Sequence, residues 1–192
     1  LVVATVPDTA PALAAGTVTL SSGTDGTAPK AEQFIGADGA ARTGMYALRN
    51  QNCALGVLHG LTDNTTWTVQ KAFGLQEGLY MICAGPSGDT ITNAVSMKAA
   101  AGLDSYGVKL MFGDWLWWDD DTNGVMLVSP QAFVAGRFGG LSPEQSSLNK
   151  QLVGVIGSQK AGLVSSGTAQ TYSDAELGAL FENGIDVICN PA

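Results

Sequence analysis

Residues 79–112 read LYMICAGPSGDTITNAVSMKAAAGLDSYGVKLMF, and this stretch decides the fold. Its first six residues form a continuous apolar run, as in a strand buried on both faces, and Val108 to Phe112 is a similar run. Between them, apolar residues recur at helical spacing from Thr90 to Leu103. A strand, a helix and a strand at this spacing predict a βαβ unit with parallel strands.

The same alternation extends toward the N-terminus. Cys53 to Leu58 predicts another buried strand, and Thr65 to Leu75 predicts a helix after it. Two short helical pieces are expected earlier, around Phe34 and around Tyr46. We therefore predict an α/β fold with a mainly parallel sheet flanked by helices.

The pattern changes after residue 112. The runs Trp115–Trp118 and Val125–Val128 flank a polar segment that ends in Asn123-Gly124, which predicts an antiparallel hairpin added to the sheet. Further along, the sequence predicts a helix over Pro130–Phe138, a strand over Leu152–Ile156, a helix that Ser173 caps with Glu176 three residues on, and a final strand over Ile185–Ile188.

The first 28 residues have a different composition, dominated by Ala, Thr, Gly, Pro and Ser, with one strand-like run at Thr17–Leu20. We expect residues 1–28 to be a connector at the end of a β-rich domain, and residues 29–192 to form the α/β domain. The chain opens at Leu1 without a basic segment ahead of an apolar one, so we expect it to begin within a longer protein rather than with a signal peptide.

Composition excludes several classes of protein. Of the 192 residues, 45% are hydrophobic and 14% charged, which is too apolar for a disordered chain. The longest apolar runs are far shorter than a transmembrane helix, so no membrane insertion is expected. The net charge of −8 makes nucleic acid an unfavourable partner. Cys53, Cys83 and Cys189 lie far apart in apolar surroundings, so we expect three small buried side chains in a reduced compartment.

One enzymatic hypothesis rests on the only histidine. His59 and Ser87 each follow a predicted strand, at the sheet edge where α/β folds place their sites, so they could form a hydrolase pair. The GxSxG motif is missing. The loop Gly85–Gly88 could also bind an anion through its backbone, but it lacks a P-loop lysine, and a tight turn with Asp89 or Thr90 capping the next helix explains it better.

A metal hypothesis rests on Asp119, Asp121 and Asn123, which match the first half of a calcium loop. The twelfth position, where such a loop needs a glutamate, is Pro130, so a solvated hairpin tip is the better interpretation. The sequon at residues 64–66 is better explained by Asn64 or Thr65 as a helix cap.

Three indoles lie within four residues. Alternation along a strand places Trp115 and Trp117 on one face and Trp118 on the other. One of these faces could be a contact surface for another protein, or a binding surface for a small ligand.

The chain resembles the contractile tail sheath proteins of bacteriophages and related injection machines over about residues 20–190. The resemblance lies in ordered pieces, which are Leu20–Gly26, Arg42–Leu48, Tyr80–Pro86, Val128–Arg137, Leu141–Pro143 with Asn149, and Asn183–Ile188. The strongest piece, VSPQAFVAGR, is similar to the family's "vPPsg.vAG". Two departures are Gly113–Trp115, which lacks the proline of the family's "yPW" strand, and Asp186, where the family usually has Asn.

This resemblance implies a structural protein of the virion tail, made in the bacterial host cytoplasm. Copies would assemble into hexameric rings around an inner tube, together with baseplate proteins, and contract to drive the tube through the host envelope. Terminal arms would add strands to a neighbour's sheet. We expect this chain to lack the carboxyl-terminal arm, and whether it is then monomeric stays open.

The resemblance calls for no catalytic residue, cofactor or metal. The alternative is an α/β hydrolase-like or metal-assisted enzyme that uses Ser87 and His59, or Asp119 and Asp121. These hypotheses differ in a testable way, because an enzyme needs convergent polar groups in one pocket whereas a sheath subunit needs exposed strand edges.

Overall fold

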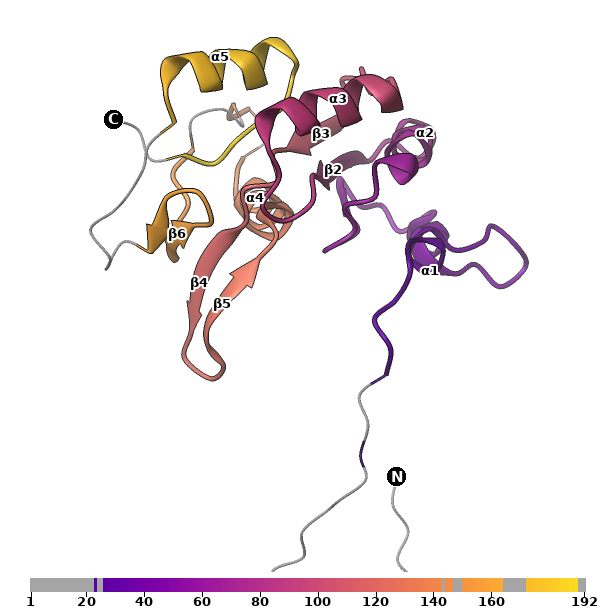
Figure 1. Ribbon diagram of the computed structural model, residues 1–192. Helices are drawn as coiled ribbons and strands as arrows, with labels where there is room; N and C mark the ends of the chain where they lie inside the picture. Colours follow the sequence, from indigo (N-terminus) through magenta and orange to yellow (C-terminus); the bar gives the residue numbers. More distant parts are fainter. Residues whose placement is uncertain (1–22, 24–25, 143, 147–149, 164–171, 190–192) are drawn as a thin grey trace, which may run out of the picture.

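The computed structural model describes residues 23, 26–142, 144–146, 150–163 and 172–189. In chain order the elements are α1 (Ala31–Ile35), the 3₁₀ helix η1 (Gly44–Leu48), β1 (Leu55–Val57), the 3₁₀ helix η2 (Asn64–Thr66), α2 (Trp67–Glu77), β2 (Tyr80–Ala84), α3 (Ile91–Ala101), β3 (Val108–Met111), β4 (Leu116–Asp120), β5 (Gly124–Val128), α4 (Pro130–Gly139), β6 (Val155–Ser158), β7 (Gly162–Leu163) and α5 (Asp174–Glu182). Figure 1 shows these helices packed around the strands. The predicted mixed α/β class is confirmed.

The first sheet is parallel, in the order β1-β2-β3. Residues 81–84 of the central strand β2 are all 0% exposed, which explains their continuous apolar run. Asp186 adds one parallel bridge beside Met111. The predicted βαβ arrangement of β2, α3 and β3 is therefore confirmed.

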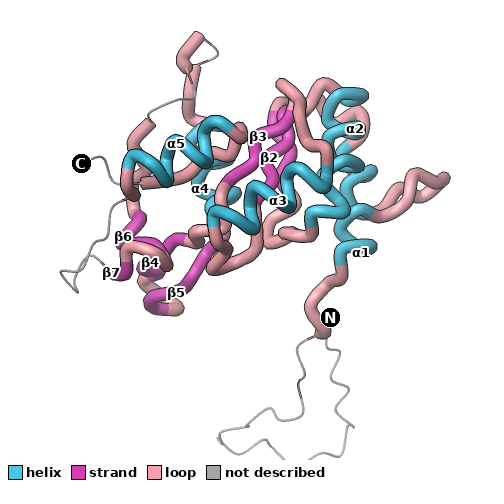
Figure 2. Tube along the Cα trace, turned by 45° about the horizontal axis from the view of Figure 1, so that its top comes forward, coloured by secondary structure: helices cyan, strands magenta, loops and turns pink. Residues whose placement is uncertain are grey.

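Helices cover both faces of this sheet (Figure 2). Side chains alternate along β2, so Cys83 packs with α2, α3 and α5, whereas Ile82 and Ala84 pack with α4 on the opposite face. The larger core cluster consists of Trp67, Cys83, Ala94, Leu103, Leu110, Phe112, Tyr172, Leu180 and Ile185.

The second sheet is antiparallel, in the order β5-β4-β6-β7. The predicted hairpin is confirmed, with Asp120 paired to Gly124. The prediction that the hairpin joins the parallel sheet is wrong. Its strand β4 pairs with β6, and the pairing shifts register between Trp117 and Trp118. Residues 112–115 separate β3 from β4, and the chain leaves the first sheet there.

Several predicted strand bounds are also wrong. The strand expected over 53–58 is only Leu55–Val57, because β1 lies at the edge of the parallel sheet and has a described partner on one side only. The strand expected over 152–156 is shifted to Val155–Ser158. The final strand is reduced to one bridge, made by Phe112 N donating to Asp186 O at 2.7 Å and Asp186 N donating to Leu110 O at 2.8 Å.

Helix caps match the sequence predictions in two of three cases. Thr90 caps α3 by accepting from Asn93 N, and Ser173 forms a capping box with Glu176 at the start of α5. The prediction of Asn64 or Thr65 as a cap is wrong, because the Asp63 carboxylate accepts from Thr65 N at 2.9 Å. An aspartate at this position satisfies the same free backbone donors.

The prediction of three buried cysteines is wrong for two of them. Cys83 is 0% exposed, but Cys53 and Cys189 are exposed because neither lies in a strand or helix that packs into the core. Within the described residues, none of the helices has the length and hydropathy needed to cross a lipid bilayer. The strand-like run at residues 17–20 and most of the 1–28 connector lie outside the described residues.

Candidate functional site

The proposed serine–histidine pair does not form. Ser87 lies in the loop between β2 and α3, and its hydroxyl donates to Gln159 Oε1 at 3.0 Å. His59 is exposed after β1, and no hydrogen bond joins it to Ser87 among the described residues. Burial raises the pKa of the Cys83 thiol to about 12, so this buried cysteine remains a neutral thiol rather than a nucleophile.

The loop from Gly85 to Asp89 instead connects the first sheet to the second through hydrogen bonds and close packing. Gln159 Oε1 also accepts from Gly88 N at 2.8 Å and from Trp115 N at 3.3 Å. A Cβ at Gly113 would lie 2.1 Å from Pro86 O, so the loop after β3 packs directly on the loop after β2. The backbone amides of Gly85 and Gly88 therefore already donate within the protein, to Met111 O and to Gly113 O and Gln159.

Asp119 and Asp121 lie at the hairpin tip, where the structure places no metal-binding cluster. Between them, the Asp120 carboxylate accepts from Asn123 N at 3.2 Å and from the Asn123 side chain. No group of three or more His, Cys, Asp or Glu side chains in the described part of the chain could hold a metal ion. The structure therefore does not join Ser87 to His59, and among the described residues it places no third metal-binding side chain beside Asp119 and Asp121.

A buried carboxylate that sequence reasoning missed lies where the two sheets meet. Asp114 is 5% exposed, and its Oδ2 accepts from Ser158 Oγ and from Tyr172 OH, both at 2.7 Å. Its Oδ1 accepts from Lys160 N at 2.8 Å. We call Asp114, Ser158, Lys160 and Tyr172 the Asp114 junction, because their bonds join the segment after β3, the β6–β7 turn and the start of α5.

Charges around this junction are paired. Lys160 Nζ bonds to Glu176 and lies 4.2 Å from the centroid of the Tyr172 ring. Burial, followed by the hydrogen bond to Asp114, raises the pKa of Tyr172, so its hydroxyl stays protonated and keeps donating. The hydrogen bonds from Lys160 and Ser173 lower the pKa of Glu176 to about 2. The junction thus holds three segments together and leaves no reactive group free.

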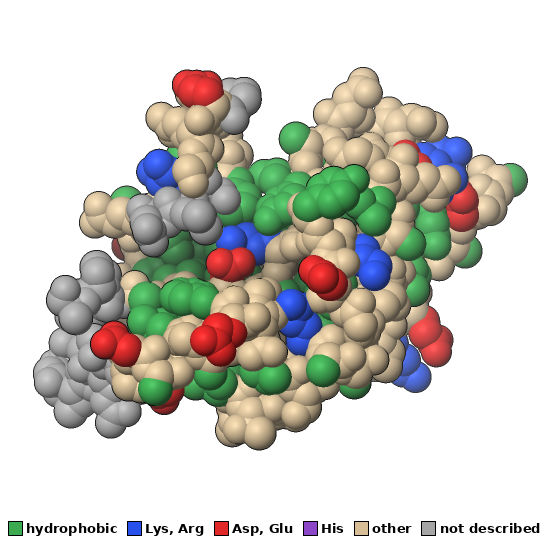
Figure 3. Space-filling view, turned by 90° about the horizontal axis from the view of Figure 1, so that it is seen from above, with side chains coloured by type: hydrophobic (Ala, Val, Ile, Leu, Met, Phe, Trp, Pro, Cys, Tyr) green, Lys and Arg blue, Asp and Glu red, His purple; other side chains and the backbone are tan. Residues whose placement is uncertain are grey.

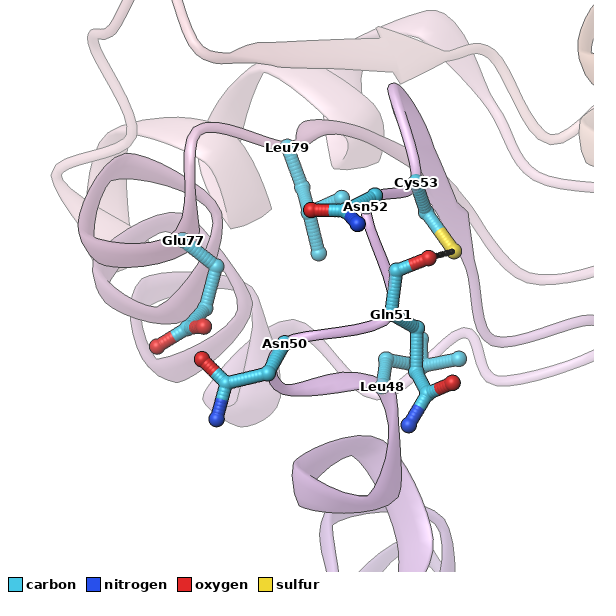
Figure 4. A pocket seen from close by; sticks show the side chains of 7 residues that line it. All are labelled: Leu48, Asn50, Gln51, Asn52, Cys53, Glu77 and Leu79. Carbon is cyan, nitrogen blue, oxygen red and sulfur yellow. Dashed lines mark hydrogen bonds between the residues drawn. The ribbon is translucent and has the colours of Figure 1, made fainter.

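The hollows of the described surface are small. One, of about 130 Å³, is lined by Leu48, Asn50, Gln51, Asn52, Cys53, Glu77 and Leu79 (Figure 4). In it, Cys53 Sγ donates to Gln51 O at 3.8 Å, and Glu77 Oε1 lies 3.0 Å from Arg49 Nε. The other, of about 140 Å³, lies between the end of α3 and the start of β3. In the first hollow the Cys53 thiol and the Glu77 carboxylate lie on opposite sides (Figure 4), each with a different partner, so they do not form a nucleophile–base pair.

Charged side chains are scattered rather than gathered. On the face shown in Figure 3, basic and acidic side chains lie interspersed around apolar surface, several of them next to a group of opposite charge. A second ion pair, Lys109 Nζ to Asp186 Oδ2 at 2.7 Å, joins the last described segment to β3. This distribution offers no basic patch on that face for nucleic acid.

The β5 strand is an open sheet edge. It pairs with β4 on one side and with no described strand on the other. Val125 and Met126 are 49% and 38% exposed, and β5 contains neither a charged residue nor a proline. Proteins usually protect edge strands with such residues. An unprotected edge of this kind can accept a strand from another chain.

The three tryptophans face different surroundings. Trp118 packs on Phe133 of α4, with ring centroids 5.5 Å apart. Trp115 precedes β4, and its Nε1 donates to Gly85 O at 3.3 Å. Trp117, opposite Leu127, is half-buried on the other face of β4. The cluster therefore serves mostly to join α4 and the β2–α3 loop to the second sheet.

Compared with models of known protein families and with curated proteins, the sequence matches none.

Proposed function

We propose that this chain is part of a structural subunit of a contractile tail sheath. Copies would form hexameric rings around an inner tail tube, within a phage tail or related injection machine, and contract when the baseplate triggers them. The ordered sequence pieces that resemble the sheath family support this proposal. Their strongest member, Val128–Arg137, runs from the last residue of β5 into α4.

The observation that carries the proposal is the open edge of β5. A ring requires each copy to present one surface to a neighbour and a different surface to the next. An extended arm that pairs with β5 would meet this requirement, because backbone hydrogen bonds supply affinity and side-chain pockets supply register. The two half-exposed residues Val125 and Met126 would then be covered.

The enzymatic alternative has no comparable support. Ser87 is bonded to Gln159, and among the described residues no third metal-binding side chain lies beside Asp119 and Asp121. Most of the polar groups around these loops serve the internal joints described above. A mechanical subunit needs joints of this kind, because it must transmit force without coming apart.

Electron microscopy tests the proposal. The complete natural polypeptide that contains these residues should form tubes or stacked six-fold rings at high concentration. Val125→Lys combined with Met126→Lys should abolish them, because charges on an edge strand oppose pairing. Val69→Lys, on the exposed side of α2, is the matched control and should leave the assemblies intact.

Two results would contradict the proposal. The first is a wild-type protein that circular dichroism shows to be folded but that forms no ring or tube at any concentration. This result would mean that the chain is not part of a sheath subunit. Tubes that form equally well in the β5 double variant would keep the sheath but exclude β5 as the pairing edge.

A further inference from the structure

The chain contains two Asn-Gly pairs whose surroundings differ. Asn123-Gly124 lies at the tip of the β4–β5 hairpin, and Asn183-Gly184 lies at the end of α5. Asn-Gly is the dipeptide in which the backbone nitrogen of the second residue is least shielded, because glycine has no side chain. That nitrogen can attack the asparagine side-chain carbon whenever the local backbone opens.

The hairpin tip can open at little cost. Residues 121–126 are all exposed, and a Cβ at Gly124 would meet nothing within 4 Å. Figure 1 shows the hairpin projecting away from the helices. Asn123 bonds to Asp120 through its backbone N and its side chain, but these bonds lie within the tip itself. Exposed loop tips with few buried contacts open with free energies near zero.

The other pair is held in place. Asn183 Nδ2 donates to Ala179 O at 2.8 Å, and Gly184 N donates to Phe181 O at 2.9 Å. Asn183 and Gly184 are themselves exposed, but they lie in the sequence between Leu180 and Ile185, which are 0% and 1% exposed and anchor the segment in the core. Opening this pair requires unpacking the end of α5 from the core, which costs much more than opening a loop tip.

We propose that Asn123 is a site of spontaneous deamidation and isoaspartate formation, and that Asn183 is protected by the fold. The backbone nitrogen of Gly124 loses its proton to solvent and bonds to Asn123 Cγ, while the Cγ–Nδ2 bond breaks and ammonia leaves. Water then opens the resulting succinimide at either carbonyl. One opening gives aspartate, and the other gives isoaspartate with Cβ in the main chain.

Either product changes the hairpin. A new carboxylate joins Asp119, Asp120 and Asp121 at the tip. Isoaspartate also lengthens the backbone by one carbon beside the Asp120–Gly124 pair, where β5 begins. The proposal does not rest on the sheath function, because it depends only on the exposure and bonding of the two pairs.

Prolonged incubation in mildly alkaline buffer tests the proposal. Peptide mapping by mass spectrometry with isoaspartate detection should show modification at residue 123 at least about tenfold faster than at residue 183, because loop tips open far more readily than core segments. In urea the two sites should react at similar rates. Asn123→Gln should remove most of the modification of the folded chain, and Asn183→Gln should leave its rate unchanged. Equal rates at both sites in the folded chain, or no modification at residue 123, would overturn the proposal.

Discussion

The Asp114 junction and the β4–β5 hairpin both contain aspartate, yet the chain uses this residue type in opposite ways in the two regions. At the junction one buried carboxylate accepts three hydrogen bonds from segments up to 58 residues away. At the hairpin tip, Asp119 and Asp121 are exposed, and the Asp120 carboxylate bonds to Asn123, three residues on. The same residue type therefore holds the tertiary structure in one region and keeps a surface soluble in the other.

In this chain, burial decides the role of a polar group. A buried carboxylate must be fully hydrogen-bonded, so it specifies which segments meet. An exposed one is already solvated and specifies little. We expect substitutions at the junction to affect folding, and substitutions at the hairpin to affect association.

The largest expected effect is from Asp114→Ala. This change leaves the hydroxyls of Ser158 and Tyr172, which are 6% and 9% exposed, without their acceptor. Each buried unsatisfied group costs about 1–3 kcal/mol, so we expect a loss of about 3 kcal/mol in the free energy of unfolding. Urea denaturation measures this loss.

Asp119→Ala at the hairpin tip is the matched control. It should change the free energy of unfolding by less than about 0.5 kcal/mol, because exposed substitutions away from specific bonds have small effects. Similar losses for the two variants would show that burial does not separate the two aspartates.

Two glycines, one in each region, differ in the space around their backbones. A Cβ at Gly113 would meet Pro86 O at 2.1 Å, so we expect Gly113→Ala to force two loops apart and cost about 2 kcal/mol. Gly124 has open space around it but a φ of +73°, so Gly124→Ala should cost only about 1 kcal/mol, from backbone strain. Urea denaturation measures both losses, and a larger loss in the free energy of unfolding for Gly124→Ala than for Gly113→Ala would contradict this ranking.

Features with a local cause could be predicted from the sequence. The continuous apolar run of β2, the Asn-Gly hairpin and the capping box at Ser173 each depend on residues a few positions apart. For such features the pattern and the structure share one cause, so the prediction holds.

Features that depend on distant partners could not be predicted. Asp114 bonds to Tyr172, and no local pattern links the two. The hairpin forms a second sheet because β4 pairs with β6, which follows α4 in the sequence. The alternation of side chains within β4 carries no information about that partner. Cys53 is likewise exposed because it precedes β1, which is a short edge strand that begins only at Leu55. Only the strand order reveals that β1 lies at the edge.

At acid pH, the free energy of unfolding should depend on the charged groups beside the Asp114 junction. The Lys160 and Ser173 hydrogen bonds lower the pKa of Glu176 from 4.5 to about 2. The group therefore contributes stability that is complete above about pH 4.5 and is lost as the pH falls toward 2. Glu176→Gln should flatten the dependence of unfolding on pH within this window, as measured by urea denaturation at a series of pH values. Glu144→Gln, an exposed change, should leave that dependence as in the wild type.

The smallest expected effect on stability is from Val125→Lys. Val125 is 49% exposed on the open side of the second sheet, so a lysine there can extend into water and leave the pairing of β5 with β4 intact. We expect the free energy of unfolding to change by less than about 0.5 kcal/mol in urea denaturation. A loss of several times that size would mean that Val125 supports the fold of the isolated chain. The open edge would then be part of the core packing, and any failure of the β5 variants to assemble would have to be attributed to misfolding rather than to a blocked edge.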